Sequence, residues 1–147
     1  MKFETTVKLN IYETIAETTQ PPTTADVARA LDAPLAQVEL AFAGLAEKRL
    51  LVLEPGTTSR VRMAPPFSGI KTPFLTRVRG NAYYANCAWD AFGVAAALGD
   101  DGDIETVDGH TGEPIFLQIR DGQPVPAECA VHFAVPAAQW WRDIIYT

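Results

Sequence analysis

A proline-interrupted segment, residues 65–76 with the sequence PPFSGIKTPFLT, divides the chain into two halves of different character. Proline lacks an amide hydrogen and has a restricted backbone, so this segment is predicted to be neither a continuous helix nor a central strand. Before it, apolar residues recur at helical spacing, and after it one apolar helix alternates with short strand-like runs. We therefore interpret residues 65–76 as a connector between an N-terminal domain, residues 1–64, and a C-terminal domain, residues 77–147.

The N-terminal half has the pattern of a winged helix-turn-helix. Helices are predicted over residues 9–18, 23–31 and 35–50, the second of them with Thr23 or Thr24 as its N-cap. Two short strands around the turn Pro55–Gly56 would form the wing.

Winged helices often bind DNA, but the third predicted helix is poorly suited to that task. Its outward positions include Glu39 and Glu47, and its only basic residues, Lys48 and Arg49, come at its end. Base edges and phosphates are contacted mainly by arginine, lysine, asparagine and glutamine, whereas this chain has a net charge of −6. We therefore expect the module to pack against the rest of the chain, and nucleic acid is not an expected partner. A winged-helix transcription regulator stays the less favoured alternative.

The C-terminal half is predicted to be a small mixed α/β domain, which makes the whole chain α+β. A helix is expected over residues 87–98, and a strand begins at Val78. Further strands are expected over residues 103–109, 114–122 and 130–136, and a short amphipathic helix, with Trp140 and Trp141, over residues 137–145.

Cys87 and Asp90 lie three residues apart at the predicted start of the helix over residues 87–98. With Asn86 as N-cap, Cys87 would occupy the first turn, where amide groups and the helix dipole stabilise a thiolate. Asp90 would project from the same face, and both burial and the nearby thiolate would raise the pKa of its carboxyl group. Such a pair can hold a soft metal on sulfur and deliver a proton from oxygen. In the structural interpretation, Cys87 is a small buried apolar residue and Asp90 complements the helix dipole.

Three motifs from residue 80 onward resemble the organomercurial (alkylmercury) lyase family. They are Tyr84-x-x-Cys87-x-x-Asp90, the helix end Leu98-Gly99, and Thr111-Gly112-x-Pro114. The resemblance is weaker over the first 64 residues. It implies a winged-helix-like domain joined to a mixed α/β catalytic domain, and an enzyme that protonates a carbon–mercury bond to give R–H and Hg²⁺. By motif, Cys87 would bind the mercury of R–Hg⁺, and Asp90 would take part in the proton transfer.

The resemblance also implies partners. The substrate would be a small organomercurial, and cellular thiols or a mercuric reductase would accept the Hg²⁺, with no cofactor beyond external thiols. The chain has neither the apolar core of a signal peptide nor a run of about 18 apolar residues, so we expect a cytoplasmic protein. The resemblance further implies a role in mercury resistance. A homodimer held by Trp140 and Trp141 is compatible with the sequence.

A second catalytic cysteine is implied by the resemblance, at a position that would fall at or just beyond Thr147. The other cysteine of the chain, Cys129, precedes the strand that should lead to that position. Three interpretations remain open: a truncated chain, a selenocysteine codon read as a stop, or a degenerate relative with another role. In the last case the protein would bind or sense mercury through Cys87 without cleaving a bond.

The remaining metal-binding residue types are not expected to form a site. Cys129 is predicted to be a buried strand residue, and His132 would then point to the opposite face of the strand. The alternative, in which Cys129 folds towards Cys87 to give a two-thiol site, stays open. His110 lies in a glycine-rich turn and is expected to be solvated. Two cysteines and two histidines at these spacings do not predict a zinc site.

Overall fold

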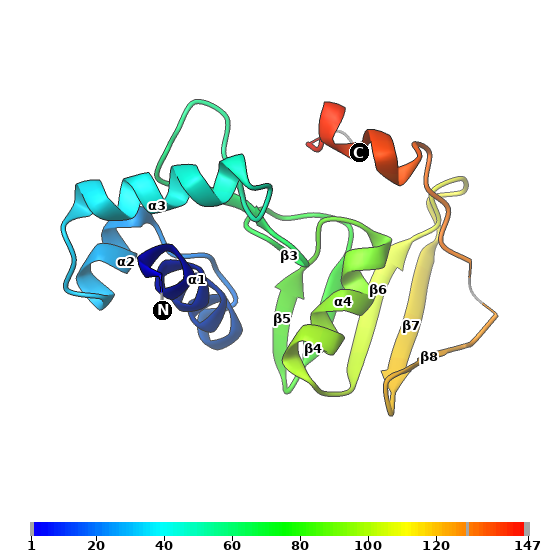
Figure 1. The fold of residues 1–147 in the computed structure, drawn as a ribbon. Helices are drawn as coiled ribbons and strands as arrows, with labels where there is room; N and C mark the ends of the chain where they lie inside the picture. The colour runs from blue at the N-terminus through cyan, green and yellow to red at the C-terminus, as the bar shows by residue number, and fades with distance from the viewer. Residues whose placement is uncertain (1, 129, 146–147) are drawn as a thin grey trace.

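The computed structural model describes residues 2–128 and 130–145, and these form an α+β fold. The helices are α1 (Phe3–Thr18), α2 (Thr24–Ala30), α3 (Leu35–Glu47), α4 (Ala88–Leu98) and the short 3₁₀ helix η1 (Ala137–Arg142). The strands are β1 (Val52–Leu53), β2 (Val61–Ala64), β3 (Phe67–Ser68), β4 (Leu75–Val78), β5 (Asn81–Tyr84), β6 (Gly102–Val107), β7 (Pro114–Arg120) and β8 (Gln123–Val125). Figure 1 shows α1–α3 gathered at one end of the molecule and α4 against the larger sheet at the other.

The strands form two antiparallel sheets. The first has the order β1-β2-β3, and the second has the order β5-β4-β6-β7-β8. β3 and the first residues of β4 lie within residues 65–76, and an isolated bridge between Phe67 and Ala85 connects β3 to the chain just after β5. The segment between the two halves therefore takes part in both sheets. The division of the chain into two domains and a connector stays a prediction.

The N-terminal helices pack through apolar residues at helical spacing. Val7, Ile11 and Ile15 of α1 and Phe42 and Leu45 of α3 are buried. Helix α1 begins at Phe3, six residues before its predicted start, because Val7 extends the same buried stripe by one turn.

Helix α2 forms as predicted, and strands β1 and β2 lie where the sequence predicts two short strands. The Thr23 side chain accepts from the Asp26 amide while the Asp26 carboxylate accepts from the Thr23 amide, which is a capping box. Strands β1 and β2 pair around the turn at Pro55–Gly56. The assignment of this half as a winged helix stays a prediction.

Alternation along β4 explains why α4 lies on one face of the second sheet. Thr76 and Val78 are buried on the α4 side, whereas Arg77 points to the other side and pairs with Glu105 at 2.8 Å. The Thr76 hydroxyl donates to the Ala91 carbonyl of α4 at 2.8 Å. The sheet thereby fixes the first turns of α4, where the candidate residues lie.

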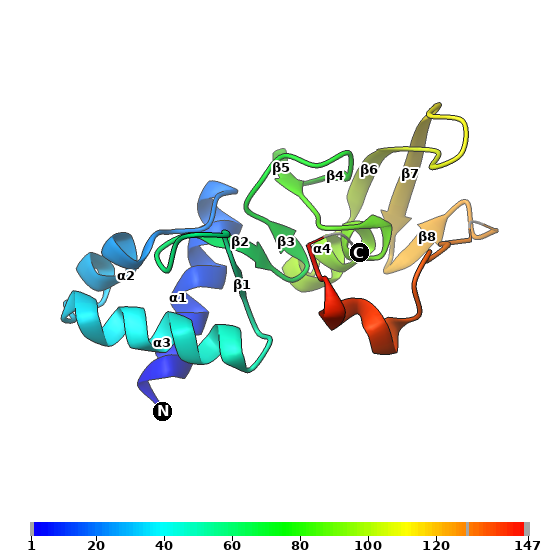
Figure 2. The same cartoon turned by 90° about the horizontal axis from the view of Figure 1, so that it is seen from above.

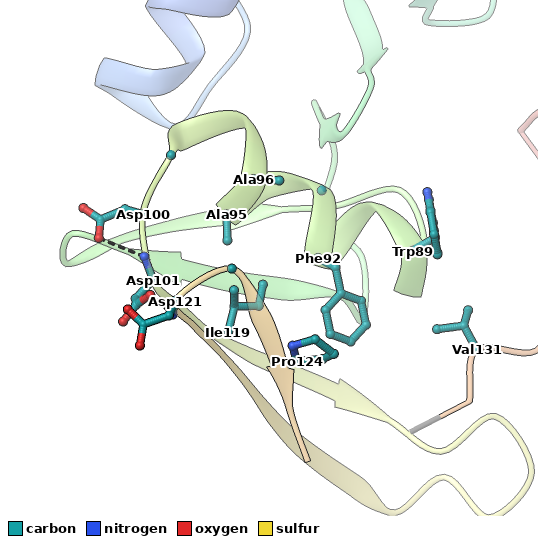
Figure 3. Close-up of a pocket in the computed structure, with 13 residues that line it drawn as sticks. Trp89, Phe92, Ala95, Ala96, Asp100, Asp101, Ile119, Asp121, Pro124 and Val131 are labelled. Atoms are coloured by element: carbon teal, nitrogen blue, oxygen red, sulfur yellow. Dashed lines mark hydrogen bonds between the residues drawn. The ribbon is translucent and has the colours of Figure 1, made fainter. Parts of the chain in front are cut away.

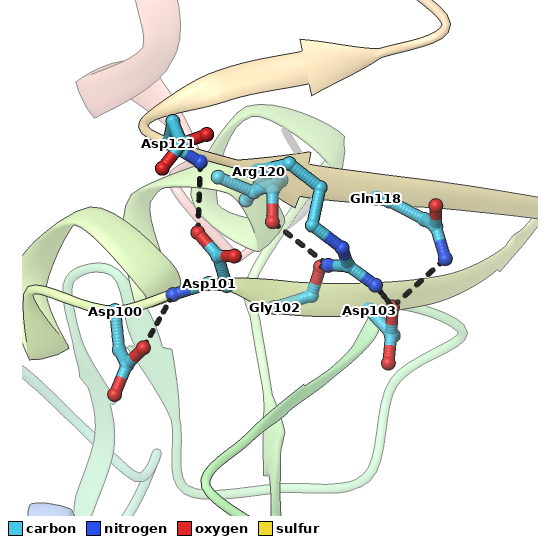
Figure 4. A network of polar contacts seen from close by, with 8 residues as sticks. Asp100, Asp101, Gly102, Asp103, Gln118, Arg120 and Asp121 are labelled. Atoms are coloured by element: carbon cyan, nitrogen blue, oxygen red, sulfur yellow. Dashed lines mark hydrogen bonds and ion pairs between the residues drawn. The ribbon is translucent and has the colours of Figure 1, made fainter.

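A set of polar contacts joins β6 to β7 at the far end of α4 (Figure 4). The Arg120 guanidinium donates to the Gly102 carbonyl at 2.8 Å and forms an ion pair with Asp103. The Asp121 amide donates to the Asp101 carboxylate at 2.8 Å. Helix α4 ends at Leu98, just before this network, and its C-cap is Gly99, whose φ of 66° is left-handed.

The two halves share one hydrophobic core. Tyr12 of α1 contacts Phe67 edge to face, and Phe67 contacts Tyr83 of β5. Seen from above in Figure 2, β3 and β5 lie between the helical end and α4. Two hydroxyl groups add polar ties: Tyr12 donates to the Pro65 carbonyl at 2.9 Å, and Tyr83 donates to the Ala16 carbonyl at 2.7 Å.

The C-terminal segment differs from its prediction. Residues 130–136 form no strand. Pro124 within β8 and Pro126 just after it have no amide hydrogen, which makes this edge of the sheet a poor partner for a further strand. The aromatic residues instead make local contacts, with the rings of Phe133 and Trp140 5.0 Å apart. The predicted helix over residues 137–145 is confined to η1. Within the described residues, no helix combines the length and the apolar character needed to cross a membrane.

Candidate functional site

Cys87 is the N-cap of α4 and carries a free thiol. The helix begins one residue later than predicted, because Cys87 has extended backbone angles and its sulfur accepts from the Asp90 amide at 3.5 Å. The expected roles are therefore displaced by one position: Cys87 rather than Asn86 caps the helix. The thiol still lies where unpaired amide groups of the first turn converge.

Burial raises the pKa of the Cys87 thiol, and the charge of Asp90 raises it further. Hydrogen bonds from the amide groups of Asp90 and Trp89 oppose this rise in pKa without cancelling it. The predicted stabilisation of the thiolate by the helix start is thus present but smaller than the cost of burial. The group is a half-buried thiol that ionises less readily than a free cysteine.

Asp90 lies on the first turn of α4, half-buried and next to Cys87. Burial raises the pKa of its carboxyl group, as the sequence predicts, while a hydrogen bond from Asn86 opposes the rise. The predicted contribution of thiolate repulsion to the Asp90 pKa is not among these causes. A carboxyl group with a raised pKa retains a proton at higher pH than an exposed aspartate does, which suits a proton donor.

Asn86 is the residue whose role sequence reasoning missed. Its carboxamide nitrogen donates to the Asp90 carboxylate at 2.9 Å and lies 3.3 Å from the carbonyl oxygens of both Pro66 and Phe67. The local sequence predicts a helix cap, because asparagine is a preferred N-cap residue. The nearby carbonyl groups belong to residues 20 and 19 positions earlier in the chain, so no spacing within the motif indicates them.

Ala85 anchors the chain immediately before these residues. Its amide donates to the Phe74 carbonyl at 2.9 Å, and its carbonyl accepts from the Thr72 hydroxyl at 2.7 Å. Together with the bridge to Phe67, these bonds fix the chain on the way into α4. Cys87 therefore lies between two ordered elements, the end of β5 with its bridge to Phe67 and the start of α4.

A cavity of about 840 Å³ lies beside α4, and neither Cys87 nor Asp90 lines it. Figure 3 shows Trp89, Phe92 and Val131 toward one end of it and Asp100, Asp101 and Asp121 toward the other. Trp89 and Phe92 belong to α4 and lie on a different face of the helix from Asp90. The cavity is thus separate from the thiol–carboxylate pair.

The other residues weighed from the sequence do not join the pair. His110 and His132 are exposed, and Cys129 and Thr147 lie outside the described residues. Within residues 2–128 and 130–145, no group of three or more His, Cys, Asp or Glu side chains could hold a metal ion.

The Thr111-Gly112 motif forms the turn between β6 and β7. The Asp108 carboxylate accepts from the amides of His110 and Thr111, at 2.8 and 2.7 Å. These bonds lower the pKa of Asp108. The motif thus has a structural explanation, as a hairpin turn.

Comparison with known proteins gives one family and one fold. The family model described as alkylmercury lyase matches residues 67–147, which are 81 of the 147 residues. The crystal structure of the mercury-bound form of MerB2 is similar in fold, with a TM-score of 0.67 and 23% sequence identity. The match covers 84% of this chain and 59% of that chain, so this chain spans about three fifths of the length of that structure. No curated protein matches the chain.

Proposed function

Because this chain belongs to the alkylmercury lyase family, we propose that it cleaves the carbon–mercury bond of a small organomercurial, R–Hg⁺, to give R–H and Hg²⁺. Cys87 is the mercury ligand and Asp90 the proton donor. The observation that carries the proposal is their placement on one helix start, with the Asp90 amide 3.5 Å from the Cys87 sulfur. A soft thiolate and a carboxyl group that retains its proton are the two groups that protonolysis needs.

The proposed reaction balances as follows. The Cys87 thiol first releases its proton to solvent, and the resulting thiolate donates an electron pair to R–Hg⁺ to form a sulfur–mercury bond. The Asp90 carboxyl group then transfers its proton to the carbon of R, and the electron pair of the carbon–mercury bond becomes the new carbon–hydrogen bond. Hg²⁺ remains on the sulfur beside the Asp90 carboxylate. Two external thiolates displace it, which returns Cys87 as a thiolate, and solvent restores the proton of Asp90.

The test is benzene release from phenylmercury by the purified chain in excess thiol. We expect the wild type to form benzene, Cys87→Ser to lose both mercurial binding and benzene formation, and Asp90→Asn to bind phenylmercury but release no benzene. Cys129→Ser is the matched thiol control, because it removes the other cysteine of the chain. Benzene release that survives Cys87→Ser would contradict the assignment of the mercury ligand.

Mercury binding without bond cleavage is a second candidate function. It is favoured by the donor set, since Cys87 is not accompanied by a cluster of further metal-binding side chains within the described residues. This candidate predicts stoichiometric phenylmercury on Cys87, lost in Cys87→Ser, with no benzene from the wild type. The same assay therefore separates the two functions.

A further inference from the structure

The neighbours of Asn86 determine which end of its carboxamide faces the site, whether or not Asp90 is protonated. The carbonyl oxygens of Pro66 and Phe67, both 3.3 Å from the Asn86 nitrogen, accept hydrogen bonds and cannot donate them. The nitrogen, not the oxygen, must therefore face this side of the site. The same nitrogen donates a hydrogen bond of 2.9 Å to Oδ2 of Asp90.

Several contacts hold the segment behind Asn86 in place. Phe67 belongs to β3, is bridged to Ala85, and packs against the Tyr12 ring of α1. The Tyr12 hydroxyl donates to the Pro65 carbonyl at 2.9 Å. The N-terminal helix therefore holds the same short segment whose carbonyl groups orient Asn86.

Pro66 also packs closely on α4. A Cβ atom added at Gly93 would lie 3.0 Å from the Pro66 Cβ, tighter than ordinary contacts allow, so glycine lets the helix approach this segment. The segment that carries the Pro66 and Phe67 carbonyl groups therefore lies directly against α4.

We propose that Asn86 is a positioning residue that orients the Asp90 carboxyl group for proton transfer, on a support that α1 holds in place through residues 65–67. Because Oδ2 accepts from Asn86, the transferable proton is carried on Oδ1 of Asp90. The Asn86 oxygen is buried and has no hydrogen-bond partner among the described residues, so the nitrogen side alone fixes the carboxamide. This inference rests on the function proposed above for Asp90.

The first test separates binding from cleavage. In Asn86→Ala we expect phenylmercury to bind Cys87 with unchanged stoichiometry and within twofold of the wild-type affinity. Single-turnover benzene release should slow by roughly 10- to 100-fold, since a small misplacement of a reacting group costs that much. Asn86→Asp should be slower still, because an ionised carboxylate of the same shape would repel Asp90 and the two carbonyl groups. Asn81→Ala is the matched control, since Asn81 is exposed at the start of β5.

A second readout does not depend on cleavage. In ¹⁵N-labelled protein, the Asn86 side-chain amide protons should exchange slowly with water, and Asp90→Ala should shift their resonances and speed their exchange. If the wild type releases no benzene, the proposed function fails, and the amide signals still decide whether Asn86 holds Asp90. The positioning role would be overturned if Asp90→Ala left the Asn86 amide resonances and their exchange unchanged. It would also be overturned if Asn86→Ala weakened phenylmercury binding as much as it slowed benzene release.

Discussion

At the scale of single residues, Cys87 and Asp90 place opposite demands on pH. Mercury binding needs the thiolate, whose formation burial opposes, whereas proton transfer needs the protonated carboxyl group, which burial favours. The same half-buried environment therefore disfavours one reactive form and favours the other. Backbone amides reduce the first effect, and Asn86 reduces the second.

This balance predicts the pH dependence of Cys87 alkylation. Since the pKa of the thiol is raised, less thiolate is present near neutral pH than for a free cysteine, and the rate should climb only as pH rises through the raised pKa. Asp90→Asn removes a charge that raises this pKa, so its profile should move toward lower pH. The measurement is iodoacetamide labelling, followed by mass spectrometry of the peptide that contains Cys87.

Asp32→Asn is the control for this experiment, because Asp32 lies in the turn between α2 and α3, away from the site. Its alkylation profile should match that of the wild type. Identical profiles for the wild type and Asp90→Asn would show that the two groups do not interact in solution.

At the scale of elements, the position of the site depends on how α4 is attached to the second sheet. Thr76 is fully buried on β4, and its hydroxyl bonds the Ala91 carbonyl in α4. Thr106 of β6 offers a contrast, because its buried hydroxyl oxygen has no hydrogen-bond partner among the described residues. The described residues therefore include a threonine whose hydroxyl group is hydrogen-bonded, Thr76, and one whose buried hydroxyl group is not, Thr106.

The two threonines make a matched pair for a stability measurement. Thr76→Val keeps the shape and removes the bond to α4, so it should lower the free energy of unfolding by about 1–3 kcal/mol. Thr106→Val removes a hydroxyl without a partner and should be neutral or stabilising. Urea unfolding monitored by circular dichroism measures both, and equal losses would contradict a specific tie between Thr76 and α4.

At the scale of the whole molecule, the two halves are joined by buried apolar contacts and by tyrosine hydroxyl groups. The Ala16 carbonyl lies in the last turn of α1, where carbonyl groups lack helical partners, and Tyr83 donates to it. Tyr83 is 3% exposed, so this bond is shielded from water. The helical half is thus fastened to the hairpin that leads into Cys87.

Tyr83→Phe tests this fastening. Loss of the hydroxyl should lower the free energy of unfolding by about 1 kcal/mol, because the Ala16 carbonyl would lose its donor. Tyr84→Phe, the next residue on β5 and less buried, should change stability less. If Tyr84→Phe costs as much as Tyr83→Phe in urea unfolding, the bond to α1 does not hold the halves together.

The parts of the fold that arise from neighbouring residues could be predicted from the sequence. Helices α2, α3 and α4 follow from apolar spacing and from local caps such as the Thr23–Asp26 capping box and Gly99. The hairpin strands β6 and β7 and the pairing of β1 with β2 follow from short apolar runs around turns. Cys87 and Asp90 are near each other because residues three positions apart at the start of a helix lie on the same face.

Contacts between residues distant in sequence could not be predicted in this way. Strands β3, β5 and β8 have two to four residues each, too few for a period, and are formed by their neighbours in the sheets. Residues 130–136 have a strand-like composition but form no strand, and β8, the edge strand that precedes them, contains a proline. Asn86 likewise contacts carbonyl groups 20 and 19 residues away instead of capping the helix. Local chemistry thus determined which groups could react, and packing between the two halves decided how they are held, because burial and long-range hydrogen bonds exist only in the folded chain.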